Sequence, residues 1–97
     1  MSTLNDLQRW YAAQCNGDWE HSYGVEIGTL DNPGWLVKID LIDTELQARE
    51  FAAISRGDSD NDADWLHAKL EDEKFQGACG ANNLNEVLEI FLKWAQG

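Results

Sequence analysis

The sequence predicts an α+β fold, in which an antiparallel sheet of about four strands is flanked by an N-terminal and a C-terminal helix packed on one face. Three observations support this prediction. Apolar residues recur at helical spacing at both ends of the chain, and they alternate with polar residues in between. The length of 97 residues suits one hydrophobic core, so residues 1–97 are expected to form a single domain.

The first element expected is a helix over residues 3–15. Its apolar side chains recur at helical spacing: Leu4, Leu7, Tyr11 and Cys15. Thr3 is the expected N-cap, because a hydroxyl can accept a hydrogen bond from a free N–H of the first turn. Asn16 and Gly17 are expected to end this helix, since glycine adopts the left-handed backbone conformation without steric cost.

Alternating apolar and polar residues predict a hairpin of two strands, over residues 21–30 and 35–41. The turn between them contains Pro33 and Gly34, which fit a type II turn with a positive φ at the glycine. A third strand is expected over residues 50–56 and a fourth over residues 65–70, ended by the acidic run at 71–73.

The last part of the chain predicts a glycine-rich connection followed by a helix. The connection is expected over residues 75–80. Asn83 and Glu86 fit a capping pattern at the start of the helix. The helix carries a broad apolar stripe made of Leu84, Val87, Leu88, Phe91, Leu92 and Ala95.

Net charge is the strongest signal in the composition. The chain has 18 acidic and 7 basic residues, which gives a formal net charge of −11. Such a field repels nucleic acid and speeds encounter with basic proteins. The alternative is that the acidic surface only keeps a small protein soluble. The sequence has neither a membrane-spanning apolar run nor a signal-peptide pattern, so we expect a cytoplasmic protein with both cysteines reduced.

Two stretches are candidate partner-binding sites, because each combines an indole with carboxylates. The first consists of Asp18, Trp19, Glu20 and His21, at the junction between the first helix and the first strand. The second consists of Asp60, Asp62, Asp64 and Trp65, in an acidic loop. Tryptophan carries much of the binding energy at protein interfaces, and surrounding carboxylates suit a basic partner. The alternative is that each tryptophan is half-buried at a sheet edge.

Metal binding is a weaker interpretation of the same residues. The alternating acids from Asp58 to Asp64 resemble the start of a calcium loop, but the glycine and the closing glutamate of that loop do not fall at matching positions. Four residues can bind zinc, but no two have the short spacing of a structural site: Cys15, His21, His67 and Cys79. We therefore expect neither a metal nor another cofactor.

Cys79 precedes the second helix, and a thiol in that position can have a lowered pKa and act as a nucleophile. With His21 or His67 as the base, and His21 the preferred one, the protein would be a small cysteine hydrolase or sulfurtransferase-like enzyme. The acidic surroundings oppose formation of a thiolate. The other open interpretation is an acidic scaffold or regulatory module with a different basic partner.

Three stretches carry a resemblance to a known family: Leu7 to Gly24, Asp31 to Trp35, and Phe75 to Gly80 with the helix that follows. They resemble the immunity protein 53 family. The resemblance covers nearly the whole chain and is weakest between Asp43 and Asp64. It implies a small cytoplasmic antidote of a bacterial polymorphic toxin system, which binds a cognate toxin domain and has no catalytic residues. A basic, nuclease-like toxin is the partner expected by class.

Overall fold

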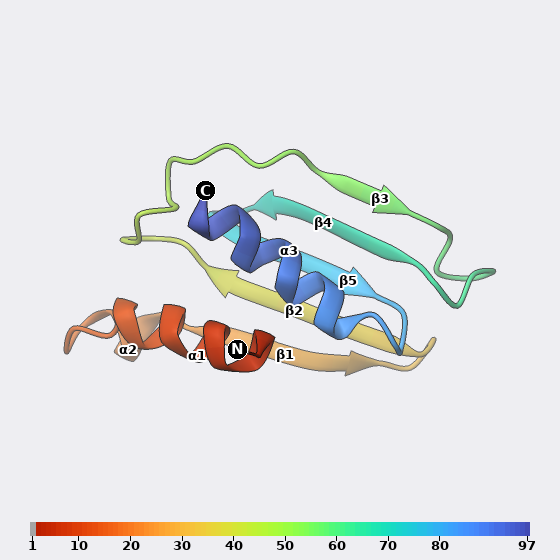
Figure 1. Cartoon of the computed structure of the whole chain (residues 1–97), viewed down its shortest axis with the longest axis horizontal. Coiled ribbons are helices and arrows are strands. Elements are labelled where there is room, and N and C mark those ends of the chain that lie inside the picture. Colours follow the sequence, from red (N-terminus) through yellow and green to blue (C-terminus); the bar gives the residue numbers. More distant parts are fainter. Residues whose placement is uncertain (1) are drawn as a thin grey trace.

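A five-stranded antiparallel sheet carries two helices on one face in the computed structural model, which describes residues 2–97 (Figure 1). The elements in chain order are α1 (Thr3–Gln14), α2 (Trp19–Ser22), β1 (Val25–Leu30), β2 (Gly34–Asp40), β3 (Ile54–Arg56), β4 (Leu66–Glu71), β5 (Lys74–Cys79) and α3 (Leu84–Gln96). The predicted α+β class and the placement of both helices are confirmed. The sheet has one strand more than expected.

The additional strand is β5, which occupies most of the predicted glycine-rich connection. The strand order is β1-β2-β5-β4-β3, so β5 lies at the centre of the sheet. Its Gly77 faces α3, and a Cβ built there would lie 2.7 Å from the Cγ1 atom of Val87. The glycine therefore marks the close approach of a helix to a strand, which is one of the meanings of glycine in a strand.

The core lies between the sheet and the helices. Strand residues on the helix-covered face alternate with residues on the open face, and α3 covers the centre with Val87, Leu88, Phe91 and Leu92. Phe91 is completely buried and packs its ring against Trp10 of α1 and Phe75 of β5, at centroid distances of 5.0 and 5.2 Å. The stripe predicted at 84–95 is thus confirmed as the core face of α3.

The helix ends differ from the predicted caps. Ser2, not Thr3, is the N-cap of α1, and its Oγ accepts a hydrogen bond from the backbone N–H of Asn5. Asn83 precedes α3, but its side-chain oxygen makes no capping bond, and its amide nitrogen donates to Asp64. Glu86 is likewise engaged elsewhere. The predicted stop after α1 is confirmed: Gly17 has a φ of +96°.

The predicted hairpin forms with two changes. The first strand begins at Val25 instead of His21, because residues 19–22 form the short helix α2. Gly34 does not have a positive φ, and the Asn32–Pro33 peptide bond is cis. Gly34 is required for a different reason, because a Cβ there would lie 2.3 Å from the carbonyl oxygen of Cys79.

The predicted third strand is shortened to Ile54–Arg56. The segment before it is held against the end of α3 instead of the sheet. The Trp94 indole donates to the carbonyl of Glu50 at 2.8 Å, and Arg49 donates to the carbonyl oxygens of Trp94 and Ala95. Phe51 packs edge-on against Phe75 at 5.5 Å. These contacts explain why an alternating pattern does not become a full strand here.

Candidate partner-binding surfaces

The two predicted binding stretches lie at opposite ends of the sheet (Figure 1). Residues 18–21 lead into β1 at its first residue, which pairs with Ile39 near the end of β2. The acidic loop leads into β4 at Leu66, which pairs with Cys79, and Cys79 pairs with Trp35 at the start of β2. Because the molecule is 43 Å long, the two stretches do not form one site.

The end of the sheet that carries the first stretch will be called the α2 end. It comprises α2 with its flanks (16–23), the turn at 41–47 and the β4–β5 turn at 72–73, which contain six acids and neither Lys nor Arg. The N–H of Leu41 joins the second segment to the third by donating to the carbonyl of Glu73 at 3.0 Å, and the Trp19 indole joins the first to the second by donating to the carbonyl of Ile42. Asp43, Asp72 and Glu73 all have positive φ values. With six acids and neither Lys nor Arg, the α2 end is acidic in all three segments.

Glu20 has a structural role at the α2 end. Its two carboxylate oxygens accept hydrogen bonds from the backbone N–H groups of Asn16 and Gly17, both at 2.9 Å. Hydrogen bonds from backbone N–H groups favour the ionised form and lower the pKa of Glu20. The Asn16 side chain in turn accepts from the N–H groups of Asp18 and Trp19. Asp18 and His21 are exposed on this folded turn.

Trp19 is a core residue and not the exposed indole that was expected. Only 3% of its surface is exposed, and its Nε1–H donates to the carbonyl of Ile42 at 2.8 Å. Three aromatic rings surround it, from Trp10, Tyr11 and Tyr23, at centroid distances of 5.9 to 6.2 Å. Its role in partner binding can only be indirect in this conformation, through the position of its neighbours Asp18 and Glu20.

The opposite end will be called the loop end, and it comprises residues 57–65. The loop is organised by its own carboxylates. Asp58 accepts from the N–H of Asp60 and from the amide of Asn61, which lowers the pKa of Asp58. Asp62 accepts from the N–H of Asp58 at 2.8 Å. Asp60 is exposed, and its bond in this network is made by its backbone N–H.

Asp64 and Trp65 connect the loop to the rest of the fold. Asp64 accepts hydrogen bonds from Arg56 and from Asn83, each at 2.8 Å. Arg56 also pairs with Glu86 of α3, and the two carboxylates raise the pKa of its guanidinium. Trp65 is 4% exposed, so it too is part of the interior and not the surface anchor that was expected. Neighbouring acids do not determine where an indole points, so the sequence did not indicate that both tryptophans are buried.

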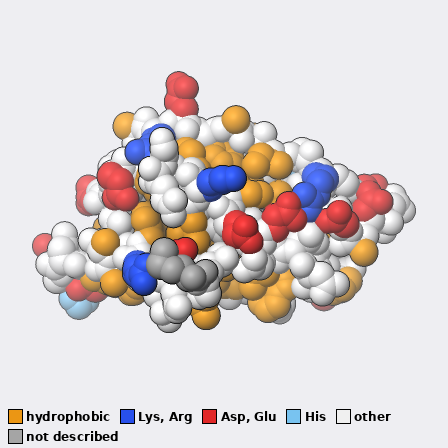
Figure 2. Space-filling view, in the orientation of Figure 1, with side chains coloured by type: hydrophobic (Ala, Val, Ile, Leu, Met, Phe, Trp, Pro, Cys, Tyr) orange, Lys and Arg blue, Asp and Glu red, His pale blue; other side chains and the backbone are white. Residues whose placement is uncertain are grey.

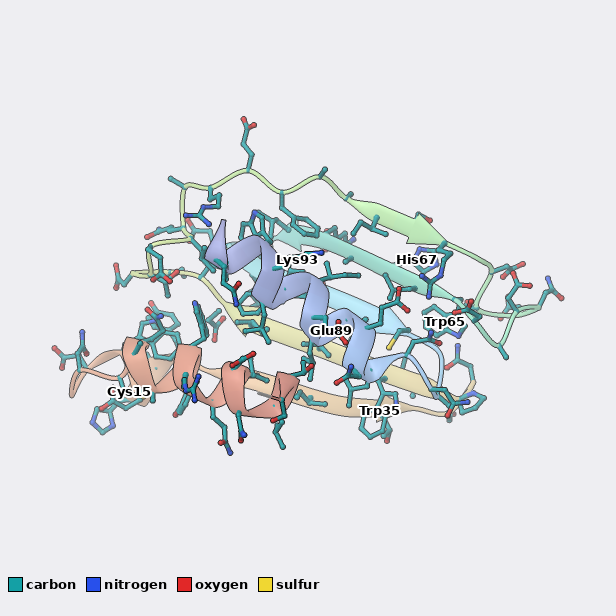
Figure 3. All side chains as sticks on the ribbon, in the orientation of Figure 1. Cys15, Trp35, Trp65, His67, Glu89 and Lys93 are labelled. Carbon is teal, nitrogen blue, oxygen red and sulfur yellow. The ribbon has the colours of Figure 1, made fainter. Side chains whose placement is uncertain are left out.

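The described residues contain no group of three or more metal-ligating side chains, which argues against the calcium and zinc interpretations. Within the same residues, no helix is long and apolar enough to cross a bilayer. In Figure 3 the labels of Cys15 and His67 lie at opposite ends of the molecule. The four candidate zinc ligands therefore do not converge.

The thiol-enzyme interpretation is contradicted by the position of Cys79. Its side chain is completely buried, and burial raises the pKa of the thiol, so the reactive thiolate is disfavoured. His21 lies at the α2 end, whereas Cys79 pairs with Trp35 at the loop end. His67 pairs with Ala78 and points to the open face, opposite to the buried Cys79. Cys79 fills a small space in the core, as unreactive cysteines commonly do.

The open face of the sheet is a third candidate surface. A shallow depression of about 390 Å³ lies over its centre, lined by residues that include Leu36, Ala78 and His67. Ser55 and His67 form a hydrogen bond of 2.9 Å between Oγ and Nδ1. Among the described residues no carboxylate bonds the His67 ring, so this pair lacks the third group that orients a catalytic base.

The open face also differs from the rest of the surface in charge. It carries three acids and three bases, placed there by the strand register: Glu26, Asp40, Glu71, Lys38, Lys69 and Lys74. Lys74 pairs with Asp40, and Lys69 with Glu71. Of the 18 acids and 7 bases, 15 acids and four bases remain elsewhere, so the whole net charge of −11 lies off this face.

These features define a small acidic α+β protein with charged surfaces at both ends of its sheet and no assembled catalytic or metal site among residues 2–97. Comparison with known families gives the particular assignment. The model of the family Immunity protein 53 matches residues 4–96, and the chain belongs to this family. No curated protein and no solved structure gives a significant match.

Proposed function

We propose that this protein neutralises a cognate toxin domain by binding it in the cytoplasm of the bacterium that makes both proteins. The observation that carries the proposal is the family match, which spans residues 4–96 and names an immunity protein. An antidote acts by occupying the surface of its target and needs no chemistry of its own. Two observations fit such a binding protein better than an enzyme. The Cys79 thiol is buried and its pKa is raised, and the candidate metal ligands lie apart.

Electrostatics favours a basic toxin domain, such as a nuclease-like one. Most of the basic side chains are already engaged within the protein. Ion pairs join Arg9 to Asp6, Arg56 to Asp64 and Glu86, Lys69 to Glu71 and Lys74 to Asp40, and Arg49 bonds to carbonyl oxygens at the end of α3. The field outside the protein is thus dominated by carboxylates. A field of this sign speeds the approach of a basic protein and weakens as salt screens it.

The test is titration calorimetry with the toxin domain encoded next to this gene, prepared in an inactive form. We expect binding with a dissociation constant of about 1 nM or below, weakened when the salt concentration is raised. Absence of binding at micromolar concentrations would contradict the proposal. Co-expression with the active toxin domain gives an independent readout, since the wild-type chain should restore growth.

Two single charge reversals locate the electrostatic contribution. Asp60→Lys changes the loop end and Asp18→Lys changes the α2 end, and both positions are exposed. The Asp18 side chain makes no capping bond in α2, so its replacement should leave the local fold intact. The reversal nearer to the bound toxin should lower the association rate more. Equal and negligible effects would remove both ends from the interface.

A further inference from the structure

β1 is an unprotected edge of the sheet. It has six residues, each paired in register with β2, and β2 is its single neighbour within the described sheet. Edge strands are commonly protected by short length, by Lys or Pro, or by an interruption of the pairing. The other edge, β3, is only three residues long and ends at Arg56, which is tied to α3. β1 is longer, its pairing is uninterrupted, and its sequence Val-Glu-Ile-Gly-Thr-Leu contains neither Lys nor Pro and one charged residue, Glu26.

The register identifies the backbone groups of β1 that face outward. The N–H of Asp40 donates to the carbonyl of Gly24 at 3.0 Å, so Gly24 and Asp40 form one of the hydrogen-bonded residue pairs of the antiparallel ladder. Such pairs alternate along an antiparallel ladder. Residues 26, 28 and 30 therefore bond to β2, and the N–H and C=O groups of Val25, Ile27 and Thr29 point away from the sheet.

Apolar side chains lie beside these free backbone groups. Four large hydrophobic side chains are exposed among the described residues, and three of them lie on α1 and β1: Leu4 (59%), Tyr11 (37%) and Ile27 (39%). Tyr11 and Val25 also line a hollow of about 330 Å³ between α1 and β1. We call Leu4, Tyr11, Val25 and Ile27 the edge strip.

The edge strip is exposed because α1 covers only the first part of β1 (Figure 1). Thr29 lies on the helix-facing side beyond α1, opposite Trp35 of β2. Figure 2 shows hydrophobic side chains gathered along the lower border of the molecule, where Figure 3 places Trp35. A second apolar group, at Trp35, therefore lies near the far end of the strand.

Acids outnumber bases at this edge. From Trp10 to Val37 the chain contains four acids, Asp18, Glu20, Glu26 and Asp31, and neither Lys nor Arg. The flanking bases are Arg9, which pairs with Asp6 on α1, and Lys38, which lies opposite Glu26 on β2. Glu26 lies on β1 itself and points to the open face, opposite to the edge strip. A second copy of this protein would bring a further −11 charge to the same edge, which opposes self-pairing. A basic strand meets no such repulsion.

We propose that β1 accepts an extended strand of the basic toxin domain, which adds to the sheet as a sixth strand. The inference rests on the proposed function and names the surface that performs it. The added strand would bond to the outward N–H and C=O groups of Val25, Ile27 and Thr29. Its alternate side chains would be apolar against the edge strip and basic beside Glu26, which is how strand addition combines affinity with specificity.

The test removes one outward donor and leaves the pairing with β2 intact. Thr29→Pro deletes an N–H that points to the partner, and proline is tolerated at such positions of edge strands. Thr29→Ala is the matched control, because it keeps the N–H. We expect Thr29→Pro to weaken binding of the inactive toxin domain at least about tenfold and Thr29→Ala to change it less than about twofold. Circular dichroism checks that both variants are folded.

Amide hydrogen exchange gives a second readout that needs no substitution. In the free protein the amides of Val25, Ile27 and Thr29 should exchange faster than those of Glu26 and Gly28, and in the complex they should become protected.

Two results would overturn the inference while leaving the proposed function in place: toxin binding that is equal in Thr29→Pro and wild type, or unchanged exchange at these amides in a formed complex. The free protein could instead form a concentration-dependent dimer that Thr29→Pro dissociates. That result would overturn the inference, because the strand bound to β1 would then come from a second copy of this protein and not from the toxin. Absence of toxin binding by the wild type would instead remove the proposed function itself, and the inference with it.

Discussion

Replacement of Trp19 distinguishes a core residue from a binding residue. The structure gives this indole a 3% exposed surface and a hydrogen bond of 2.8 Å to the carbonyl of Ile42. Trp19→Phe keeps most of the apolar contact but leaves that carbonyl without its donor, which costs about 1–3 kcal/mol when water cannot replace it. Trp19→Ala also removes the ring, and such truncations cost about 3–5 kcal/mol.

These costs are large compared with the stability of a small domain, which is about 5–15 kcal/mol. Urea unfolding followed by far-ultraviolet circular dichroism measures them as shifts of the midpoint at a constant slope. Trp35→Phe is the matched control, because the Trp35 indole also donates to a backbone carbonyl, that of Ala81 at 2.9 Å. Ala81 is exposed, so water can replace the donor and the loss should be smaller.

The reasoning would be refuted if Trp19→Phe stayed within about 0.5 kcal/mol of the wild type and lowered the toxin affinity instead, since surface substitutions change stability by no more than that. Such a result would show that the indole leaves the core and contacts the partner. The expected result is a less stable protein whose affinity is unchanged under conditions where it is fully folded.

Two further predictions concern packing and pH. Gly77→Ala should destabilise the protein by about 1–3 kcal/mol, because its Cβ would lie 2.7 Å from Val87. Val87→Ala should relieve part of that loss in the double variant. Gly28→Ala is the control: its Cβ would meet no atom within 4 Å, so it should be close to neutral in the same urea assay. The hydrogen bond from Arg56 lowers the pKa of Glu86 below its unfolded value, so the pair stabilises the fold above about pH 4.3 and loses this effect as the pH falls through the folded pKa. Arg56→Met should therefore lower the urea midpoint at pH 7, and the difference in midpoint between the variant and the wild type should shrink below about pH 4. A difference in midpoint that does not change with pH would contradict the ion pair.

The proposed strand addition would also account for specificity. Backbone bonding along β1 is independent of side chains, so it would supply affinity for an extended segment of almost any sequence. The edge strip and Glu26 would then select which segment binds. The acidic α2 end and loop end would act at longer range, where charge affects the rate of encounter more than the final affinity.

Local signals in the sequence determined most of the elements. The spacing of apolar residues specified α1 and the core face of α3, because a helical period can be read without knowledge of its neighbours. The left-handed conformation of Gly17 followed from the Asn-Gly pair for the same reason. The acidic excess and the resemblance along residues 7–24 also pointed to a binding protein before any contact was known.

The tertiary structure alone decided the features that depend on residues far apart in the chain. Gly77 was read as a loop residue because only the crossing of Val87 explains its missing side chain. The burial of Trp19 was not predicted, because its partner Ile42 is 23 residues away. The insertion of β5 between β2 and β4 leaves β1 at the edge, and it places the two acidic stretches at opposite ends. Strand order and burial are set by long-range packing, which a local pattern of charge and hydrophobicity does not encode.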